Sequence, residues 1–261
     1  MWFFLLFFIV IIVRHRFFWK INKDDMDKKY GVLFAHRGIT KNYPENTLNA
    51  YLDAVKFGYK AIELDVVVSK DKQLICSHNH DLEYETNGKG KFKDFDIFDL
   101  KELKTGIYSH PKNTQQICTL KEVLKTVPVD VFLNIELKTE YWHDLKIAKI
   151  LNDYRKKGLL KHKYIVSSFN PFLIFYMKFF TNIGKVGFLI AYRNWLWMIN
   201  WIHPDMLHPS AELLDNSLLN FCKKKNLLIN TWTVNNKSVL DYCKKNKING
   251  VITDFHKPLL I

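Results

Sequence analysis

The sequence predicts an α/β protein built on a single (β/α)8 TIM-type barrel. From Gly31 onward, short apolar runs alternate with amphipathic stretches, which is typical of parallel strands joined by helices. The length of 261 residues is close to that of one such barrel. Hydrophobic residues make up 48% of the chain, and glycine and proline number only 10 and 7, which excludes a disordered or collagen-like protein.

The expected strands and helices alternate along the chain. Strand-like runs, rich in apolar and β-branched residues, occupy positions 32–35, 61–68, 73–77, 131–137, 164–169, 186–191, 206–208, 228–234 and 251–253. Helix-like runs occupy positions 47–57, 120–127, 145–156, 171–180, 218–225 and 239–245. The second and third strands are separated only by residues 69–72, too few for a parallel crossover, so they should form a hairpin. A turn about Lys70 and Asp71 would place Glu63 opposite His78.

The N-terminal stretch 2–13 is continuously apolar, and basic and aromatic residues follow it over 14–19. As a helix it would cover about 18 Å of a hydrocarbon core about 30 Å thick, and snorkelling arginines and interfacial rings would lengthen the embedded part. No basic segment precedes it and no small-residue cleavage site follows, so a retained membrane anchor is favoured over a cleaved signal peptide or a buried helix. The basic C-terminal flank predicts that the barrel is cytoplasmic.

The domain organisation follows from these patterns. We expect a hydrophobic anchor over residues 1–21 and a barrel over residues 30–258. A polar stretch after the third strand, about residues 80–118, has no sustained period and is expected to be a small insertion. The aromatic stretch 169–202 suits either a membrane-facing loop or packed core.

The charge balance restricts the class of partner. Lysine and arginine number 39 against 26 acidic residues, and the resulting net charge of +13 favours nucleic acid, a phospholipid surface or a phosphorylated substrate. The lysines are dispersed and no nucleic-acid-binding module is recognisable, so we expect no nucleic-acid partner. Nothing in the sequence indicates an oligomeric state.

Three acidic residues are predicted to meet at one end of the barrel. Glu63 and Asp65 share one face of a strand, because side chains alternate across it. Glu136 and Lys138 lie on the polar face at the end of a later strand, where barrel active sites are built. Carboxylates this close repel each other unless a cation lies between them, and oxygen ligands suit Mg²⁺ or Ca²⁺. Glu136 is therefore expected to be the third metal ligand and Lys138 a phosphate contact.

The first strand ends in His36, Arg37 and Gly38. Histidine can transfer a proton at neutral pH, and an arginine guanidinium can hold a phosphoryl group through two hydrogen bonds. The position of His36 and Arg37 at a strand end, beside the predicted acidic cluster, makes them candidates for catalysis and phosphate binding.

Further motifs occur in order from about residue 32 to about residue 256. They are His36-Arg37-Gly38, Pro44-Glu45-Asn46-Thr47, Glu63-x-Asp65, a histidine followed by Thr86-Asn87-Gly88, Ile135-Glu136-Leu137-Lys138, Ser168-Phe169, Thr231-Trp232-Thr233-Val234-Asn235 and Ile252-Thr253-Asp254. This combination resembles the glycerophosphodiester phosphodiesterase family of the phosphatidylinositol-phospholipase-C-like superfamily. The resemblance implies a (β/α)8 barrel, a divalent cation, and cleavage of a glycerophosphodiester to glycerol 3-phosphate and an alcohol. The expected anchor, the aromatic stretch and the net charge of +13 add a lysophospholipid, cleaved to lysophosphatidic acid, as a second candidate substrate.

The resemblance also implies roles for individual residues. His36 and His78 become the acid–base pair, Glu63, Asp65 and Glu136 metal ligands, Arg37 and Lys138 phosphate contacts, and Trp232 a wall of the substrate pocket. The family usually has aspartate directly after its second catalytic histidine, so His80-Asp81 competes with His78; the spacing to Asn87-Gly88 favours His78. The family commonly has an arginine at the position of Tyr84. The resemblance therefore does not predict the contact that the insertion makes at this position, whereas the predicted chemistry is unaffected.

Several alternatives stay open at this point. The attacking group is either the substrate's own glycerol hydroxyl, giving a cyclic phosphate, or water. A catalytically silent membrane protein that binds phospholipid headgroups, and a sphingomyelinase-D-like lyase that releases cyclic phosphate, are the other functions considered. A water-soluble diester and a lysophospholipid with membrane lipid around it are both candidate partners.

Overall fold

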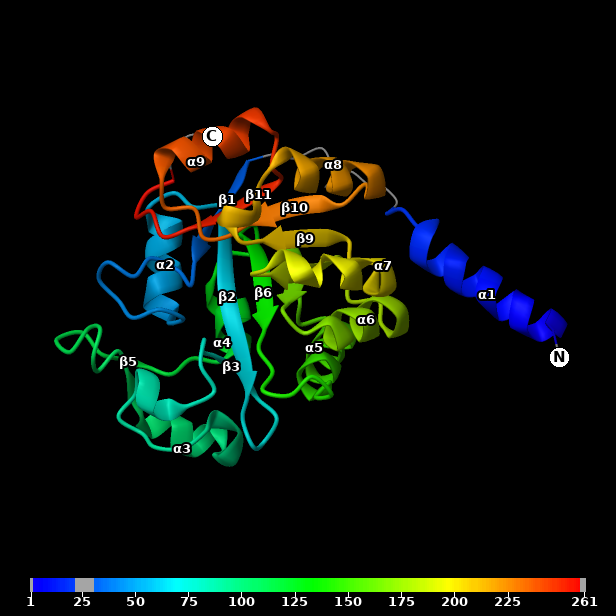
Figure 1. Ribbon diagram of the computed structural model, residues 1–261. Coiled ribbons are helices and arrows are strands. Elements are labelled where there is room, and N and C mark those ends of the chain that lie inside the picture. The colour runs from blue at the N-terminus through cyan, green and yellow to red at the C-terminus, as the bar shows by residue number, and fades with distance from the viewer. Residues whose placement is uncertain (1, 22–30, 259–261) are drawn as a thin grey trace.

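The structure is a computed structural model that describes residues 2–21 and 31–258. Within these residues, eight parallel strands close into a barrel (Figure 1). In order around the barrel they are β1 (Val32–His36), β11 (Gly250–Thr253), β10 (Leu228–Thr231), β9 (Met206–Pro209), β8 (Val186–Ile190), β7 (Tyr164–Ser168), β6 (Phe132–Leu137) and β2 (Ala61–Val68), which pairs again with β1. The predicted barrel is confirmed.

Helices follow most of the strands and cover the outside of the barrel. They are α2 (Leu48–Lys56), α4 (Leu120–Thr126), α5 (Lys146–Lys156), α6 (Pro171–Phe180), α8 (Asn216–Lys225) and α9 (Lys237–Lys245). Local sequence sets their ends: the Thr47 hydroxyl accepts a hydrogen bond from the Ala50 amide at the start of α2, and Pro171 opens α6. The aromatic stretch also contains a 3-10 segment (Arg193–Met198) and the short helix α7 (Ile199–Ile202).

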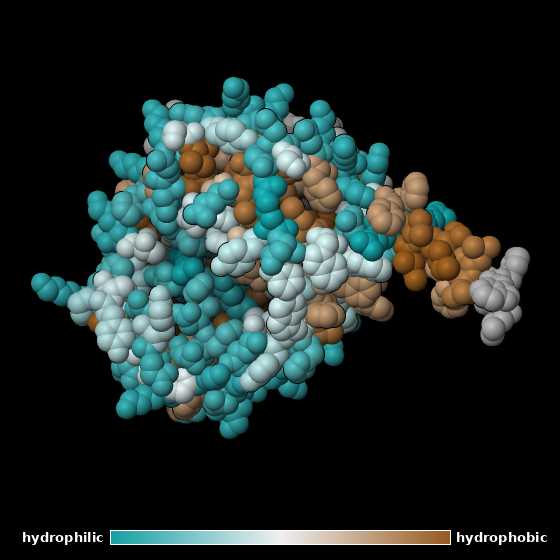
Figure 2. Space-filling model, viewed as in Figure 1, coloured by the Kyte–Doolittle hydropathy of each residue, from teal (hydrophilic) through white to brown (hydrophobic). Residues whose placement is uncertain are grey.

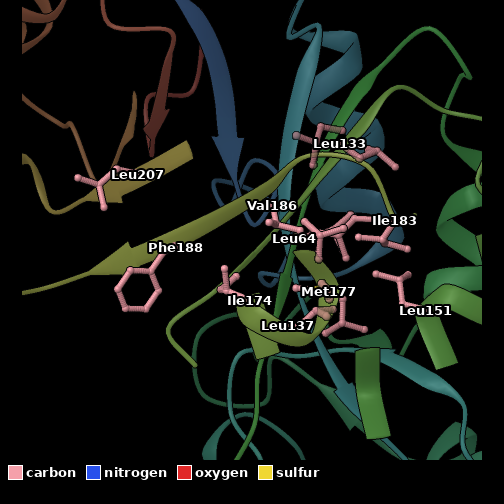
Figure 3. Packing of buried hydrophobic residues seen from close by; sticks show 14 of the residues in the cluster. Leu64, Leu133, Leu137, Leu151, Ile174, Met177, Ile183, Val186, Phe188 and Leu207 are labelled. Carbon is pink, nitrogen blue, oxygen red and sulfur yellow. The ribbon is translucent and has the colours of Figure 1, made fainter. Parts of the chain in front are cut away.

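The main hydrophobic core lies between the barrel wall and the helical layer. Leu64 of β2 and Leu133 of β6 belong to one buried cluster with Leu151 of α5 and with Ile174 and Met177 of α6 (Figure 3). These five side chains are 1% exposed or less. Burial of this apolar area fixes which face of each strand points outward, and therefore which face points into the barrel.

The inward-facing side chains change from apolar to polar along the barrel axis. One end is filled by a separate apolar cluster that contains Ile165, Met206 and Leu228, with Phe132 packed against it. Two residues further along their strands lie buried polar side chains, Asn134, Ser167, His208 and Asn230. A further two residues along are Glu136, Phe169, Ser210 and Trp232, at the carboxyl ends of the strands, where the candidate site lies.

Strand β3 (Leu74–Cys76) runs antiparallel to β2, so the predicted hairpin is present. Its register differs from the prediction by one residue, because Val66 pairs with Cys76 and Val68 with Leu74. The turn centres on Asp71, with Lys72 in the left-handed region at φ 64°. Glu63 is therefore not paired with His78, although the Ser77 amide donates to the Asp65 carbonyl and keeps this segment beside β2.

The insertion after β3 forms a small subdomain beside the hairpin. It contains two 3-10 segments (Leu82–Tyr84 and Phe92–Asp94), helix α3 (Ile97–Glu102) and the paired strands β4 (Lys104–Thr105) and β5 (Gln115–Gln116). Leu82, Phe92 and Leu100 form a small core of their own against Val67 and Ile75 of the hairpin. The boundary predicted between residues 21 and 30 lies outside the described residues.

The prediction of a membrane-anchored protein is wrong. Helix α1 (Trp2–Phe17) projects from the barrel, and Figure 2 shows its hydrophobic side chains. Its 16 residues rise about 24 Å, less than the roughly 30 Å of a hydrocarbon core, and its last turn carries Arg14, His15 and Arg16. Among the helices of the described residues, none combines the length and the apolar content needed to cross a bilayer.

Candidate active site

Three buried carboxylates meet at the carboxyl ends of β2 and β6. The parallel register of these strands places Asp65 beside Glu136, and Glu63 lies two residues before Asp65 on the same face. Oxygen atoms of Glu63, Asp65 and Glu136 lie within 4.8 Å of one another. None of the three side chains is more than 8% exposed, so water screens the repulsion between them poorly.

Two basic side chains neutralise part of this charge. The Lys138 ammonium contacts Glu136 and lies 3.0 Å from Asp65 Oδ1, while Arg37 Nε lies 3.2 Å from Asp65 Oδ2. The side-chain amide of Asn46 donates a hydrogen bond to Asp65 Oδ2 at 2.9 Å. Burial alone would raise the pKa of Asp65, but the charges of Lys138 and Arg37 outweigh it and hold that pKa below its usual value. Asp65 is therefore the ionised centre of the cluster.

Glu63 is the carboxylate with the least compensation. Its Oε2 accepts a hydrogen bond from the Arg37 amide at 3.1 Å, but its buried Oε1 has no partner among the described residues. Burial and the charge of Asp65 raise the pKa of Glu63 to about 8. An orphaned buried carboxylate oxygen, facing two further carboxylates, is a donor set that fits a hard divalent cation.

His36, the last residue of β1, is oriented by an aspartate. Its Nδ1 lies 2.7 Å from Asp254 Oδ1, and the other oxygen of Asp254 accepts a hydrogen bond from the Asn235 amide at 2.6 Å. Burial lowers the pKa of His36, but its hydrogen bond to Asp254 and the charge of Glu63 more than offset this, so the pKa is raised. With Nδ1 engaged, Nε2 is the nitrogen through which His36 can exchange a proton.

His78 lies in the segment that follows β3 and has the opposite electrostatic setting. Its Nδ1 lies 3.1 Å from the side-chain oxygen of Asn79. Burial and the charge of Lys138 lower the pKa of His78 to about 4, so this imidazole is neutral at neutral pH. The two histidines therefore differ in their readiness to hold a proton.

Arg37 occupies a strained turn that links β1 to the acidic cluster. Its φ is 57°, and its guanidinium donates to both carboxylate oxygens of Glu45 at 2.9 and 2.8 Å. This residue, predicted to contact phosphate, is thus held between Glu45 and Asp65. Tyr51 donates to the Asn46 side-chain oxygen at 2.9 Å and fixes the loop from the other side.

The sequence profile of the glycerophosphoryl diester phosphodiesterase family matches residues 36–257. The chain belongs to this family. It is therefore an enzyme of the glycerophosphodiester phosphodiesterase type, a phosphoric diester hydrolase.

Individual relatives agree with the family assignment. A glycerophosphodiester phosphodiesterase from Caldanaerobacter subterraneus subsp. tengcongensis is 31% identical over 238 residues, which cover 88% of this chain and 96% of the relative. The crystal structure of a glycerophosphodiester phosphodiesterase from Thermotoga maritima is 30% identical, with a TM-score of 0.71 over 87% of this chain and 96% of that one. A phosphodiesterase from Oleispira antarctica, solved with the product sn-glycerol-3-phosphate, shares the fold at 24% identity and a TM-score of 0.75, over 86% of this chain and 93% of that one.

In this glycerophosphodiester phosphodiesterase, the predicted residues occupy one mouth of the barrel. The three predicted metal ligands and the two predicted phosphate contacts lie close together. Carboxylate oxygens of Glu63, Asp65 and Glu136 lie within 4.8 Å of one another, and Arg37 and Lys138 form ion pairs with this cluster. The charges of Asp65 and Lys138 act on His78, and that of Glu63 acts on His36.

Trp232, predicted as a pocket wall, follows β10 at the same mouth. Its indole NH donates to the His208 carbonyl at 2.8 Å. Phe169, which follows β7, packs edge-on against its ring with 5.4 Å between the ring centroids. These two contacts hold the indole ring in place.

Sequence reasoning assigned no role to Asp254, Asn46 or Glu45, although each belongs to one of the quoted motifs. Asp254 orients His36, Asn46 binds Asp65, and Glu45 holds Arg37. The signal available for Asp254 was its position directly after the last strand, where parallel strands present side chains to an active site.

Proposed function

We propose that the protein is a metal-dependent phosphodiesterase that cleaves glycerophosphodiesters to glycerol 3-phosphate and an alcohol by acid–base catalysis between two histidines. The observation that supports this most is the cluster of three buried carboxylates, within 4.8 Å of one another, next to His36 and His78. Burying three carboxylates together without a cation costs free energy. Groups in such an unfavourable environment are found mainly at active sites.

The metal would be held by Glu63, Asp65 and Glu136. Oxygen-only ligands favour Mg²⁺ or Ca²⁺, and the unpartnered Oε1 of Glu63 supplies a donor atom for it. When bound, such an ion supplies positive charge that stabilises the developing charge of a phosphoryl transition state.

Residues of the chain would orient the substrate and move its protons. Arg37 and Lys138 would bind phosphate oxygens, and Trp232 would form a wall beside the glycerol half. His78, which is neutral at neutral pH, suits the base that takes a proton from the attacking oxygen. His36, whose pKa is raised by its hydrogen bond to Asp254 and by the charge of Glu63, suits the acid that protonates the departing oxygen.

The substrate class is proposed from the relatives and from the site. The Oleispira antarctica phosphodiesterase binds sn-glycerol-3-phosphate as product, which supports a glycerophosphodiester as the substrate here. Lysophospholipids carry the same phosphodiester and stay within the proposal. The attacking oxygen is that of the glycerol hydroxyl or of water, and the lyase alternative would end at the cyclic phosphate.

Turnover of a glycerophosphodiester by purified variants tests this function. Replacing either histidine, His36→Ala or His78→Ala, should lower kcat by roughly 10²- to 10⁴-fold, the range that one acid or base supplies. The exposed His143 provides a control, since His143→Ala removes an imidazole that does not contact the cluster residues.

The products separate the alternatives. Phosphorus NMR should show glycerol 3-phosphate as the final product, whereas a cyclic phosphate that accumulates as the only product would support the lyase. Near-normal turnover by His78→Ala would contradict the proposed mechanism, and absence of turnover by the wild-type protein would favour the silent headgroup-binding alternative.

A further inference from the structure

A hollow of about 230 Å³ opens beside the carboxylate cluster. It lies between His80 of the insertion, the loop after β6 with Glu140 and Trp142, and Phe169 after β7. Glu136 and Lys138 also line it, so the hollow, here called the side hollow, adjoins the expected phosphate position. A second space, lined by Asn46 and His78 among others, measures only about 30 Å³.

We propose that the side hollow binds the alcohol half of the substrate and selects against alcohols that carry a positive charge. This inference rests on the proposed function, because it takes the phosphate to lie at Lys138 and Arg37. One liquid water molecule occupies about 30 Å³, so the hollow accommodates an alcohol of roughly six to eight non-hydrogen atoms. That size covers both glycerol and choline, and size alone therefore does not choose between them.

Both carboxylates that line the side hollow are already paired with lysines, and Glu136 contacts the Lys138 ammonium. Glu140 accepts hydrogen bonds from both Lys91 and Lys93 of the insertion. With both ammonium groups in contact, Glu140 offers no unpaired negative charge at the rim. A quaternary ammonium in the side hollow would have to compete with these two lysines for Glu140, whereas a neutral polyol would not.

Aromatic rings near the hollow, which could otherwise bind a cation on their faces, already lie against lysines. The Lys138 ammonium lies 5.9 Å from the centroid of the Phe169 ring, and the Lys93 ammonium lies 5.2 Å from that of Tyr141. Trp142 packs against Trp195 with 5.1 Å between ring centroids. A substrate cation would have to displace these ammonium groups to use the ring faces of Phe169 and Tyr141.

The side hollow retains groups suited to an uncharged alcohol. His80 is neutral at neutral pH, since burial lowers its pKa, and a neutral imidazole can both donate and accept hydrogen bonds. The Thr139 hydroxyl, which accepts a hydrogen bond from the Asn170 amide at 3.0 Å, keeps its own proton to donate. Polyol hydroxyls can pair with both groups.

Two diesters with the same glycerophosphate half test the inference. Glycerophosphoglycerol offers a neutral polyol and glycerophosphocholine a quaternary ammonium. Wild-type protein should have the higher kcat/KM for glycerophosphoglycerol. In the double variant Lys91→Gln/Lys93→Gln, Glu140 is released, and the choline-to-glycerol ratio of kcat/KM should rise on the order of tenfold. The double variant Lys223→Gln/Lys224→Gln, at exposed positions on α8, removes the same net charge and should leave the ratio unchanged.

Distinct results overturn the inference and the proposed function. A wild-type preference for glycerophosphocholine, or a ratio that Lys91→Gln/Lys93→Gln does not raise, would overturn the charge selection while diester cleavage stands. Equal loss on both substrates would show that the hollow holds the shared glycerophosphate half. Should the double variant fail to fold, Lys93→Gln alone, at an exposed lysine, should shift the ratio in the same direction by a smaller factor. No cleavage of either diester would overturn the proposed function first.

Discussion

His36 and Asp254 are joined by a contact between residues 218 positions apart in the sequence. Asp254 is itself fixed by Asn235, whose amide donates to one carboxylate oxygen and whose side-chain oxygen accepts from the Asp254 backbone at 2.9 Å. The imidazole is thereby held in one orientation, with one ring nitrogen engaged. We infer that Asp254 is a positioning residue, which acts on the substrate only through His36.

Replacing Asp254 by asparagine should separate catalysis from binding. Asp254→Asn keeps the side-chain size but removes the charge that favours protonated His36, so kcat should fall on the order of 10²-fold while KM stays within about twofold. Steady-state kinetics on a glycerophosphodiester would measure this. Asp241→Asn, at an exposed position on α9, should change neither constant. An unchanged kcat, or a loss confined to KM, would contradict the positioning role of Asp254.

The loop between β1 and α2 positions several of the groups in the site. Gly38 has φ 85°, and a Cβ at this position would lie 2.6 Å from the Ala50 backbone carbon of α2. The glycine therefore lets β1 turn sharply against α2, which brings both Arg37 and Asn46 to Oδ2 of Asp65. Both the backbone angle and the close approach require glycine here.

Alanine substitutions at two glycines separate these requirements. Gly158 also has a positive φ, 68°, but no atom lies within 4 Å of the position a Cβ would take. Gly158→Ala should cost about 1 kcal/mol of unfolding free energy from backbone strain, and Gly38→Ala about 2 kcal/mol more from the clash. Urea unfolding would measure both values, and Gly38→Ala should also lose activity. Equal stabilities of the two variants would contradict the close packing of β1 on α2.

The strands and helices were largely predictable, because their residues repeat with the period of their own secondary structure. The bounds of β2 and α6 were predicted to the residue, and Glu63, Asp65 and Glu136 followed from alternation in two strands. The hairpin register was wrong by one residue, since the left-handed turn at Lys72 leaves no periodic signal. The α1 anchor was wrong because the apolar pattern indicates a helix without settling whether it is long enough to span.

Contacts that form only when the barrel closes could not be predicted from the sequence. The pairing of Asp254 with His36 arises because β11 lies beside β1, and no local pattern connects two residues so far apart. The contact of Lys91 and Lys93 with Glu140 likewise depends on how the insertion folds over the loop after β6. To predict such contacts, the relative positions of whole elements must be known. To predict the metal-ligand candidates, it was enough to know on which face of a strand each side chain lies.

At the scale of the whole molecule, the barrel encloses a polar layer beneath the site. His208 of β9 is fully buried there, and neither ring nitrogen has a hydrogen-bond partner among the described residues. Burial lowers its pKa to about 3, so the folded protein keeps this imidazole neutral. The unfolded chain takes up a proton on it near pH 6.5, and stability contributed by neutral His208 is therefore lost as the pH falls below about 6.5.

Acid sensitivity of folding should depend on His208. Between pH 7 and pH 5, the unfolding free energy of the wild-type protein should fall by about 2 kcal/mol more than that of His208→Gln, which has no imidazole to protonate at this position. Urea unfolding at the two pH values measures the difference. His203, with a pKa lowered to about 4 mainly by burial, contributes equally in both proteins and cancels. The same loss in both proteins would contradict a neutral His208 in the folded barrel.

The carboxylate cluster is the feature on which the enzymatic account depends. The most direct test follows release of glycerol 3-phosphate from a glycerophosphodiester by wild-type protein before EDTA treatment, after it, and after adding back Mg²⁺ or Ca²⁺, with Glu63→Gln assayed in parallel. We expect chelation to abolish release, one of the two ions to restore it, and Glu63→Gln to gain little from either ion. Undiminished release in EDTA, or wild-type activity of Glu63→Gln, would contradict the enzymatic account.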